Sequence, residues 1–143
     1  MRLLFIDDDP EHIQTVSDVV REALDVPVDV VSTVEDAVIT LHEHEYTLIV
    51  TDIFIPLGDA PRRSLGPRAR RYQETLQHLG GLVLLDEIDR LDRAPRVLAH
   101  TACTDFALIE ILGEQVHARV PKPAPVDVLL NAVLDALDLP TPQ

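Results

Sequence analysis

Three consecutive carboxylates follow the first apolar run of the sequence, residues 3–6. They are Asp7, Asp8 and Asp9, and a further aspartate, Asp52, lies in a later apolar run. Two ionised carboxylates ~4 Å apart repel each other by roughly 4 kcal/mol at an effective dielectric constant near 20. If Asp7, Asp8 and Asp52 converge, they therefore need a bound cation or raised pKa values. Asp9 stands before a proline, a pattern typical of a helix cap.

The same set of residues could carry phosphate chemistry. Mg²⁺ prefers hard oxygen ligands and usually takes one or two carboxylates, with water and phosphate oxygens in its other positions. Lys122 offers a fixed positive charge and Thr101 a hydroxyl donor, so the two could stabilise a transferred phosphoryl group. Asp52 stands alone, whereas Asp7 and Asp8 are adjacent. This pattern favours Asp52 as the nucleophile and the adjacent pair as metal ligands.

Short apolar runs alternate with helical patterns along the chain. The runs that predict strands are 3–6, 28–31, 47–56 (ending at Asp52), 96–102 and 117–120. Helices are predicted over 9–24, after a cap at Ser32 or Thr33, and over about 125–137. Five strands that alternate with helices predict an α/β fold, a doubly wound parallel sheet with helices on both faces.

The expected site residues each follow a predicted strand. In an open α/β sheet, ligands bind in the crevice beyond the carboxyl ends of the strands. The fold therefore predicts that these polar residues, distant in sequence, converge on one edge of the sheet: Asp7, Asp8, Asp52, Thr101 and Lys122.

Length and composition predict one domain over 1–139, followed by a short tail at 140–143. The net charge of −13 argues against nucleic acid and anionic membranes as partners, because both attract basic surfaces. A single cysteine, Cys103, excludes an internal disulfide and suits a reducing cytoplasm. With no predicted signal peptide or membrane span, we expect a cytoplasmic protein.

One segment interrupts the predicted alternation of strands and helices. Residues 57–79 predict an inserted loop and helix that carries five of the 12 basic residues, namely Arg62, Arg63, Arg68, Arg70 and Arg71. Gly80-Gly81 is expected to close that helix, before the next helix begins with "LVLLDEIDRL". Two interpretations remain open: a solvated surface insertion, or a basic lid or docking surface beside the site.

Four motifs, in order along the chain, resemble the receiver domain of two-component response regulators: "LLFIDDDP", "LIVTDIFIP", "VLAHTA" and "VPKP". The resemblance implies a stand-alone signalling protein, not an enzyme, phosphorylated on Asp52 by a histidine kinase or phosphotransfer protein and read by an unknown downstream protein. It implies Mg²⁺ held by Asp8, by Asp52, by Asp7 through water and by the Phe54 carbonyl. Thr101 would be the switch hydroxyl, and Lys122 would bind phosphate and precede a cis peptide bond.

The sequence departs from the family pattern at three further positions. Arg119 stands where receivers usually carry the aromatic residue of the switch, which implies a different readout of phosphorylation. Phe54 and Cys103 occupy the positions that flank the path of the hydrolytic water in the family. Neither side chain orients water as an amide or carboxylate does, so we expect slow autodephosphorylation.

Two alternatives to a phosphorylated switch remain. The first is a receiver-like interaction module that is not phosphorylated and binds through the arginine-rich insertion or Arg119. The second is a phosphohydrolase of another α/β family with an aspartyl nucleophile. Those enzymes favour a second aspartate two residues after the nucleophile, where this chain has Phe54.

Overall fold

The computed structural model describes residues 1–52, 80–102 and 116–138 of the chain. Within these ranges, the elements follow in the order β1 (Leu3–Ile6), α1 (Pro10–Leu24), β2 (Val28–Val31), α2 (Val34–Glu43), β3 (Leu48–Thr51), α4 (Gly80–Asp89), β4 (Arg96–Thr101), β5 (Ala118–Pro121) and α6 (Val126–Ala136). None of the helices in the described ranges is long and apolar enough to cross a membrane.

The strands form one parallel sheet in the order β2-β1-β3-β4-β5. β1 lies between β2 and β3, so the chain turns back across the sheet after β2. All residues of β1 and β3 are buried, which is why both strands consist of nearly continuous apolar runs. The predicted five-stranded α/β fold is confirmed.

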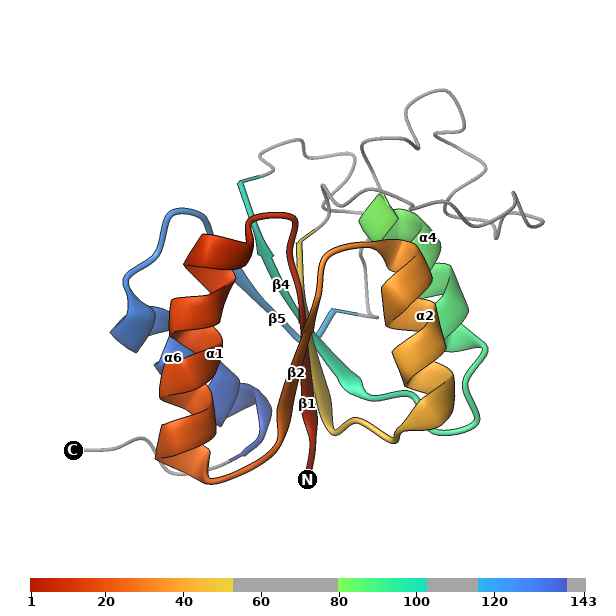
Figure 1. Cartoon of the computed structure of the whole chain (residues 1–143), viewed down its shortest axis with the longest axis horizontal. Coiled ribbons are helices and arrows are strands. Elements are labelled where there is room, and N and C mark those ends of the chain that lie inside the picture. The colour runs from red at the N-terminus through yellow and green to blue at the C-terminus, as the bar shows by residue number, and fades with distance from the viewer. Residues whose placement is uncertain (53–79, 103–115, 139–143) are drawn as a thin grey trace.

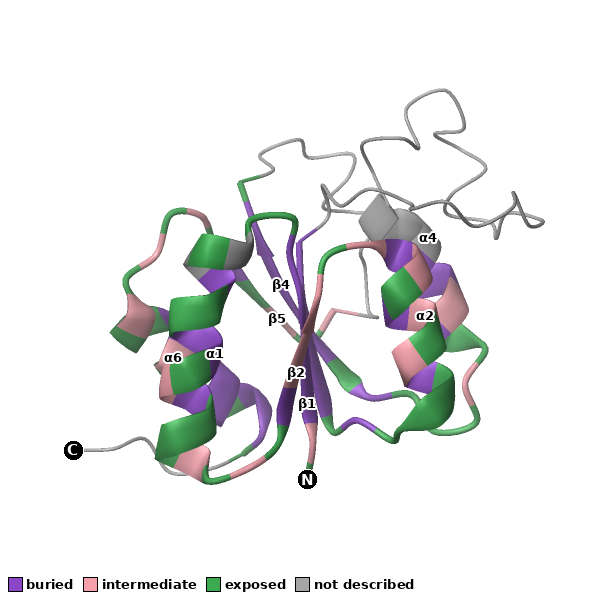
Figure 2. Cartoon of the chain, viewed as in Figure 1, coloured by how far each residue is buried: buried purple, intermediate pink, exposed green. Residues whose placement is uncertain are grey.

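Helices cover both faces of the sheet (Figure 1), and alternate side chains along each strand enter different cores. Leu3 and Phe5 of β1 pack in the core beneath α1 and α6, while Leu4 and Ile6 pack in the core beneath α2 and α4. Figure 2 shows the consequence: the strands are largely buried, and the helices expose their outer surfaces. The sheet is thereby fixed from both sides.

Several helix boundaries follow from local chemistry. α1 begins directly after Asp9, and Thr33 caps α2, where its hydroxyl accepts a hydrogen bond from the Asp36 backbone N–H at 3.1 Å. The expectation that Gly80-Gly81 precedes a helix is wrong, because α4 begins at Gly80. Glycine weakens a helix mainly in its interior, and the first turn tolerates it. Residues 57–79, with the predicted insertion, lie outside the described part of the chain.

We expect α6 to show directly how much burial on the sheet stabilises this fold. Val133 is fully buried against the sheet, whereas Val128 on the same helix is 46% exposed. Val133→Ala should lower the free energy of unfolding by roughly 2–3 kcal/mol, because two methyl groups leave a packed core. Val128→Ala, the matched control, should change it by about 0.5 kcal/mol or less. Urea denaturation measures both, and equal losses would contradict the assignment of the buried face.

Candidate phosphoacceptor site

The candidate site lies at the edge of the sheet where the strands end. The parallel register aligns Ile6 with Thr51 and Thr101 with Pro121. The residues that follow β1, β3 and β5 therefore emerge at the same edge, although Lys122 is 115 residues from Asp7 in the sequence. Backbone hydrogen bonds continue past the strand ends, since the Asp52 N–H donates to the Ile6 carbonyl at 3.0 Å.

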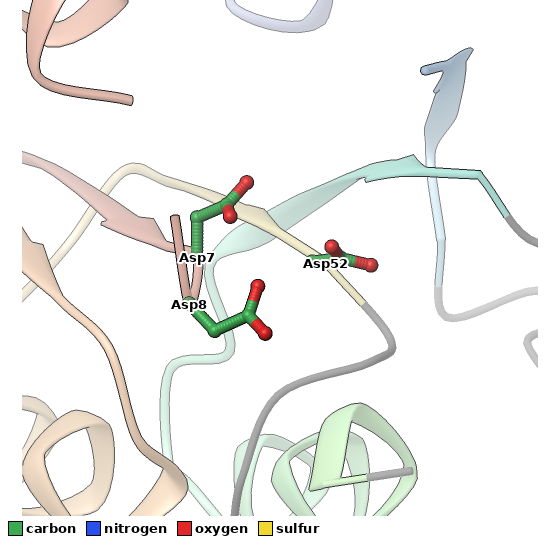
Figure 3. A group of neighbouring side chains, drawn as sticks. All are labelled: Asp7, Asp8 and Asp52. Atoms are coloured by element: carbon green, nitrogen blue, oxygen red, sulfur yellow. The ribbon is translucent and has the colours of Figure 1, made fainter. Parts of the chain in front are cut away.

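Three carboxyl groups meet at this edge, as the sequence analysis expected (Figure 3). One oxygen from each of Asp7, Asp8 and Asp52 lies within 4.8 Å of the others. Asp7 and Asp52 are buried, with 1% and 4% of their surface exposed, and Asp8 is exposed. Two carboxylates are thus held at the floor of the site, and the third faces solvent.

Lys122 supplies the positive charge within this group. Its Nζ donates to Asp7 Oδ2 at 2.6 Å and to Asp52 Oδ2 at 2.8 Å. Burial opposes the charge of the ammonium group, but hydrogen bonds and electrostatic attraction from Asp52 and Asp7 outweigh it and raise the pKa of Lys122. The lysine therefore stays protonated at neutral pH and offsets the repulsion between the two buried aspartates.

Among the described residues, Asp8 forms no ion pair like those of Asp7 and Asp52, and its pKa shows the remaining repulsion in the site. Desolvation, followed by the negative charges of Asp7 and Asp52, raises the pKa of its carboxyl group. The attraction of Lys122 opposes this shift but does not reverse it. A cation beside Asp8 would favour the ionised form, so the site is electrostatically suited to a further positive charge.

The donor set fits a magnesium ion. Mg²⁺ binds oxygen ligands in an octahedron at about 2.0–2.1 Å, so its ligand oxygens lie about 2.9–4.2 Å apart. Carboxylate oxygens within 4.8 Å of one another can reach such an ion directly or through water. Asp7 Oδ1 also accepts a hydrogen bond from the Asp9 backbone N–H at 2.9 Å, which fixes the orientation of that carboxylate.

Thr101 lies at the end of β4 and is buried. Its backbone carbonyl accepts a hydrogen bond from the Lys122 N–H at 3.0 Å, so the strand that carries the hydroxyl also holds the lysine in register. The peptide bond between Lys122 and Pro123 is cis, as the family resemblance implied. Arg119 is exposed on β5, opposite Ala99 of β4.

Some of the predicted site residues lie outside the described part of the chain, and the structure adds contacts that the sequence does not predict. Phe54 and Cys103 lie outside the described ranges, as does the arginine-rich segment. The sequence predicts Lys122 beside transferred phosphate oxygens but gives no sign of its bond to Asp7. The buried ring of His100 lies 3.0 Å from the Val120 carbonyl.

Comparisons with known proteins rest on structure alone. The sequence matches no protein-family model, and no curated protein sequence matches it. Many solved structures do match with probability 1.00.

Three of these solved structures illustrate the likeness. The receiver domain of a Francisella response regulator has a TM-score of 0.71 at 20% identity, with 96% of each chain covered. A DNA-binding response regulator of the LuxR family from Staphylococcus aureus has a TM-score of 0.72 at 17% identity, with 95% of this chain and 98% of that chain covered. A two-component response regulator from Clostridium difficile has a TM-score of 0.69 at 16% identity, with 96% of each chain covered. The chain has the fold of response-regulator receiver domains.

Proposed function

We propose that this protein is a response regulator that accepts a phosphoryl group on Asp52 and signals through the conformational change that follows. The observation that supports it most strongly is the meeting of Asp7, Asp8, Asp52 and Lys122 at the carboxyl edge of a receiver-type sheet. An ordinary cluster of surface acids stays solvated, because burying charged carboxylates is costly; here two of the acids are buried around one lysine.

Asp52 is the proposed nucleophile. Its carboxylate oxygen attacks the phosphorus atom of a donor, the new oxygen–phosphorus bond forms, and the bond between phosphorus and the donor atom breaks with its electron pair leaving on the donor. The product is an aspartyl phosphate. Burial of Asp52 beside Lys122 supports this assignment, because the lysine holds the carboxylate in position and the protein shields it from bulk water.

The other residues stabilise the charge of the transferred group. Magnesium, when bound, supplies positive charge that offsets the negative charge on the phosphoryl oxygens. Asp8 and Asp52 would hold the ion directly and Asp7 through water, with the Phe54 carbonyl as a further proposed ligand. Lys122 would bind a phosphoryl oxygen, and the Thr101 hydroxyl would donate to another. The Lys122 ammonium group donates to both Asp7 and Asp52, so it lies next to the carboxylate that would accept the phosphoryl group.

The proposed partners follow from this chemistry. A histidine kinase or phosphotransfer protein would supply the phosphoryl group, and an unknown downstream protein would recognise the phosphorylated state. The net charge of −13 disfavours nucleic acid and membrane surfaces as partners. We place the protein in the cytoplasm and regard signalling, not turnover of a substrate, as its role.

A second candidate is a receiver-like module that binds a partner without phosphorylation. The exposed Arg119 on β5 favours it, because a guanidinium at that place offers a docking group in either phosphorylation state. The intact set of acids around Lys122 favours the first proposal instead.

Phosphorylation is tested by the intact mass of the protein after incubation with a small-molecule phosphodonor. We expect a single phosphoryl adduct that requires Mg²⁺, because a bound cation offsets the repulsion between the three carboxylates and an anionic phosphodonor. Asp52→Asn should abolish the adduct. Asp9→Asn, the matched control, removes a neighbouring carboxylate and should leave the adduct unchanged. A folded protein that gains no adduct, or gains one equally in Asp52→Asn, would overturn the proposal.

The repulsion of Asp8 by Asp7 and Asp52 leads to a prediction about stability and pH. The pKa of Asp8 is raised in the folded state, so its ionisation destabilises the fold as the pH rises above 3.8, the ordinary pKa of an aspartate side chain. Without divalent cations, Asp8→Asn should therefore be more stable than the natural protein at neutral pH, and the difference should shrink as the pH approaches 3.8.

Magnesium should reverse this order of stability. A ligand that binds only the folded state stabilises it by mass action, and the natural protein should gain more than the Asp8→Asn variant. Thermal unfolding with chelator and with Mg²⁺ measures both effects, and Asp9→Asn serves as the control. A variant that is less stable than the natural protein in chelator would contradict the electrostatic account.

A further inference from the structure

A second candidate site lies at the opposite edge of the sheet, where the strands begin. A hollow of about 540 Å³ opens there between the segments that lead into β1, β3 and β4. Three of the 12 basic residues of this acidic chain line it, namely Arg2, Arg93 and Arg96. Met1 lines the hollow, which therefore lies at the end of the sheet where Figure 1 marks the N-terminus, whereas Asp7 and Asp52 follow the opposite ends of β1 and β3.

Backbone hydrogen bonds fix the main chain at Arg2 and Arg96. The Thr47 N–H donates to the Arg2 carbonyl at 2.8 Å, and the Arg96 N–H donates to the Thr47 carbonyl at 3.1 Å. Arg2 and Arg96 therefore flank Thr47 on adjacent strands. The wall beside them is also fixed, because the buried Tyr46 donates its hydroxyl to Asp29 at 2.5 Å. A ligand would find this site largely preformed.

The guanidinium groups retain hydrogen-bonding capacity. Arg2 uses Nε and Nη2 to bind Asp29 at 2.7 and 3.2 Å. Arg96 uses Nη1 to bind the Ala136 carbonyl and Asp138. Each guanidinium has five N–H donors, so both have donors beyond these bonds. Arg93 is exposed and forms no ion pair with a carboxylate in the described part of the chain.

The shape of the site favours an extended ligand. A second hollow of about 390 Å³ adjoins the first and shares part of its lining with it, including Tyr46, Arg93 and Pro95. Glu45 lines both hollows and Asp92 lines only the second, so basic side chains outnumber acidic ones in the first hollow, where Arg2 and Arg96 lie. A peptide chain can span both hollows, with carboxylates at one end only.

We propose that this arginine-lined hollow binds an acidic segment of a partner protein. Arg93 supplies a charge that no carboxylate of the described residues pairs with, and Arg2 and Arg96 supply further donors for carboxylate oxygens. The net charge of −13 repels acidic chains from the protein as a whole, so such a segment binds only where basic groups are concentrated. The inference is independent of phosphorylation at Asp52.

The test is a titration of the unphosphorylated ¹⁵N-labelled protein, without Mg²⁺, with a short oligoglutamate peptide, followed by NMR. We expect the backbone amides of Thr47, Arg93 and Arg96 to shift with the glutamate peptide and not with oligoglutamine of the same length. Arg93→Ala should weaken binding at these amides about fivefold, the effect of losing roughly 1 kcal/mol of ion pairing. Added salt should weaken it further.

Arg90→Ala is the matched control. It removes the same charge three residues away, from a side chain that pairs with Glu87 and does not line the hollow. Equal weakening by the two variants, or no shifts at these amides, would overturn the proposal. Inorganic phosphate that shifts the same amides at equal concentration would overturn the assignment to a peptide. Asp52→Asn should bind oligoglutamate like the natural protein, so the result does not depend on the phosphoacceptor proposal.

Discussion

The repulsion among three carboxylates at one edge of the sheet is the constraint on which the site depends. Two of them, Asp7 and Asp52, are buried, where unpaired charges are very costly. Lys122 makes the arrangement possible by donating to both. Asp8 keeps a raised pKa, because the attraction of Lys122 opposes the shift without reversing it. A divalent cation beside Asp8 would offset the remaining repulsion among the three carboxylates.

The topology of the sheet is what brings these charges together. β1 and β3 are adjacent, so Asp7 and Asp52 leave the sheet side by side. β5 lies two strands from β3, and the long lysine side chain crosses the intervening distance to reach the acids. The two apolar cores on either face keep the strand ends in register. A change in sheet order would separate the residues without altering any local sequence motif.

Much of this arrangement could be predicted from the sequence, because its causes are local or repeat along the chain. Apolar runs predict the strands, caps predict the starts of α1 and α2, and the rule for ligand sites in parallel sheets predicts the shared edge. β3 stops at Thr51, just before Asp52, and β5 begins one residue later than expected. Such differences arise because strand ends depend on pairing with neighbours, which a single sequence does not reveal.

Other features depend on tertiary contacts and left no sequence signal. The bond between Lys122 and Asp7 requires the order of the strands, and the arginine-lined hollow requires three separate loops to meet. Arg2, Arg93 and Arg96 look like ordinary surface residues when read along the chain. The start of α4 at Gly80 was missed for a related reason, because packing against α2 can outweigh the low helix propensity of glycine.

We propose that Asp52, and not its acidic neighbours, forms the covalent bond to phosphorus. Borohydride reduction of the phosphodonor-treated protein converts an aspartyl phosphate to homoserine, and peptide mass spectrometry then locates the modified residue. We predict homoserine at position 52 alone. Homoserine at position 7 or 8, or none in a protein that carries a phosphoryl adduct, would contradict it.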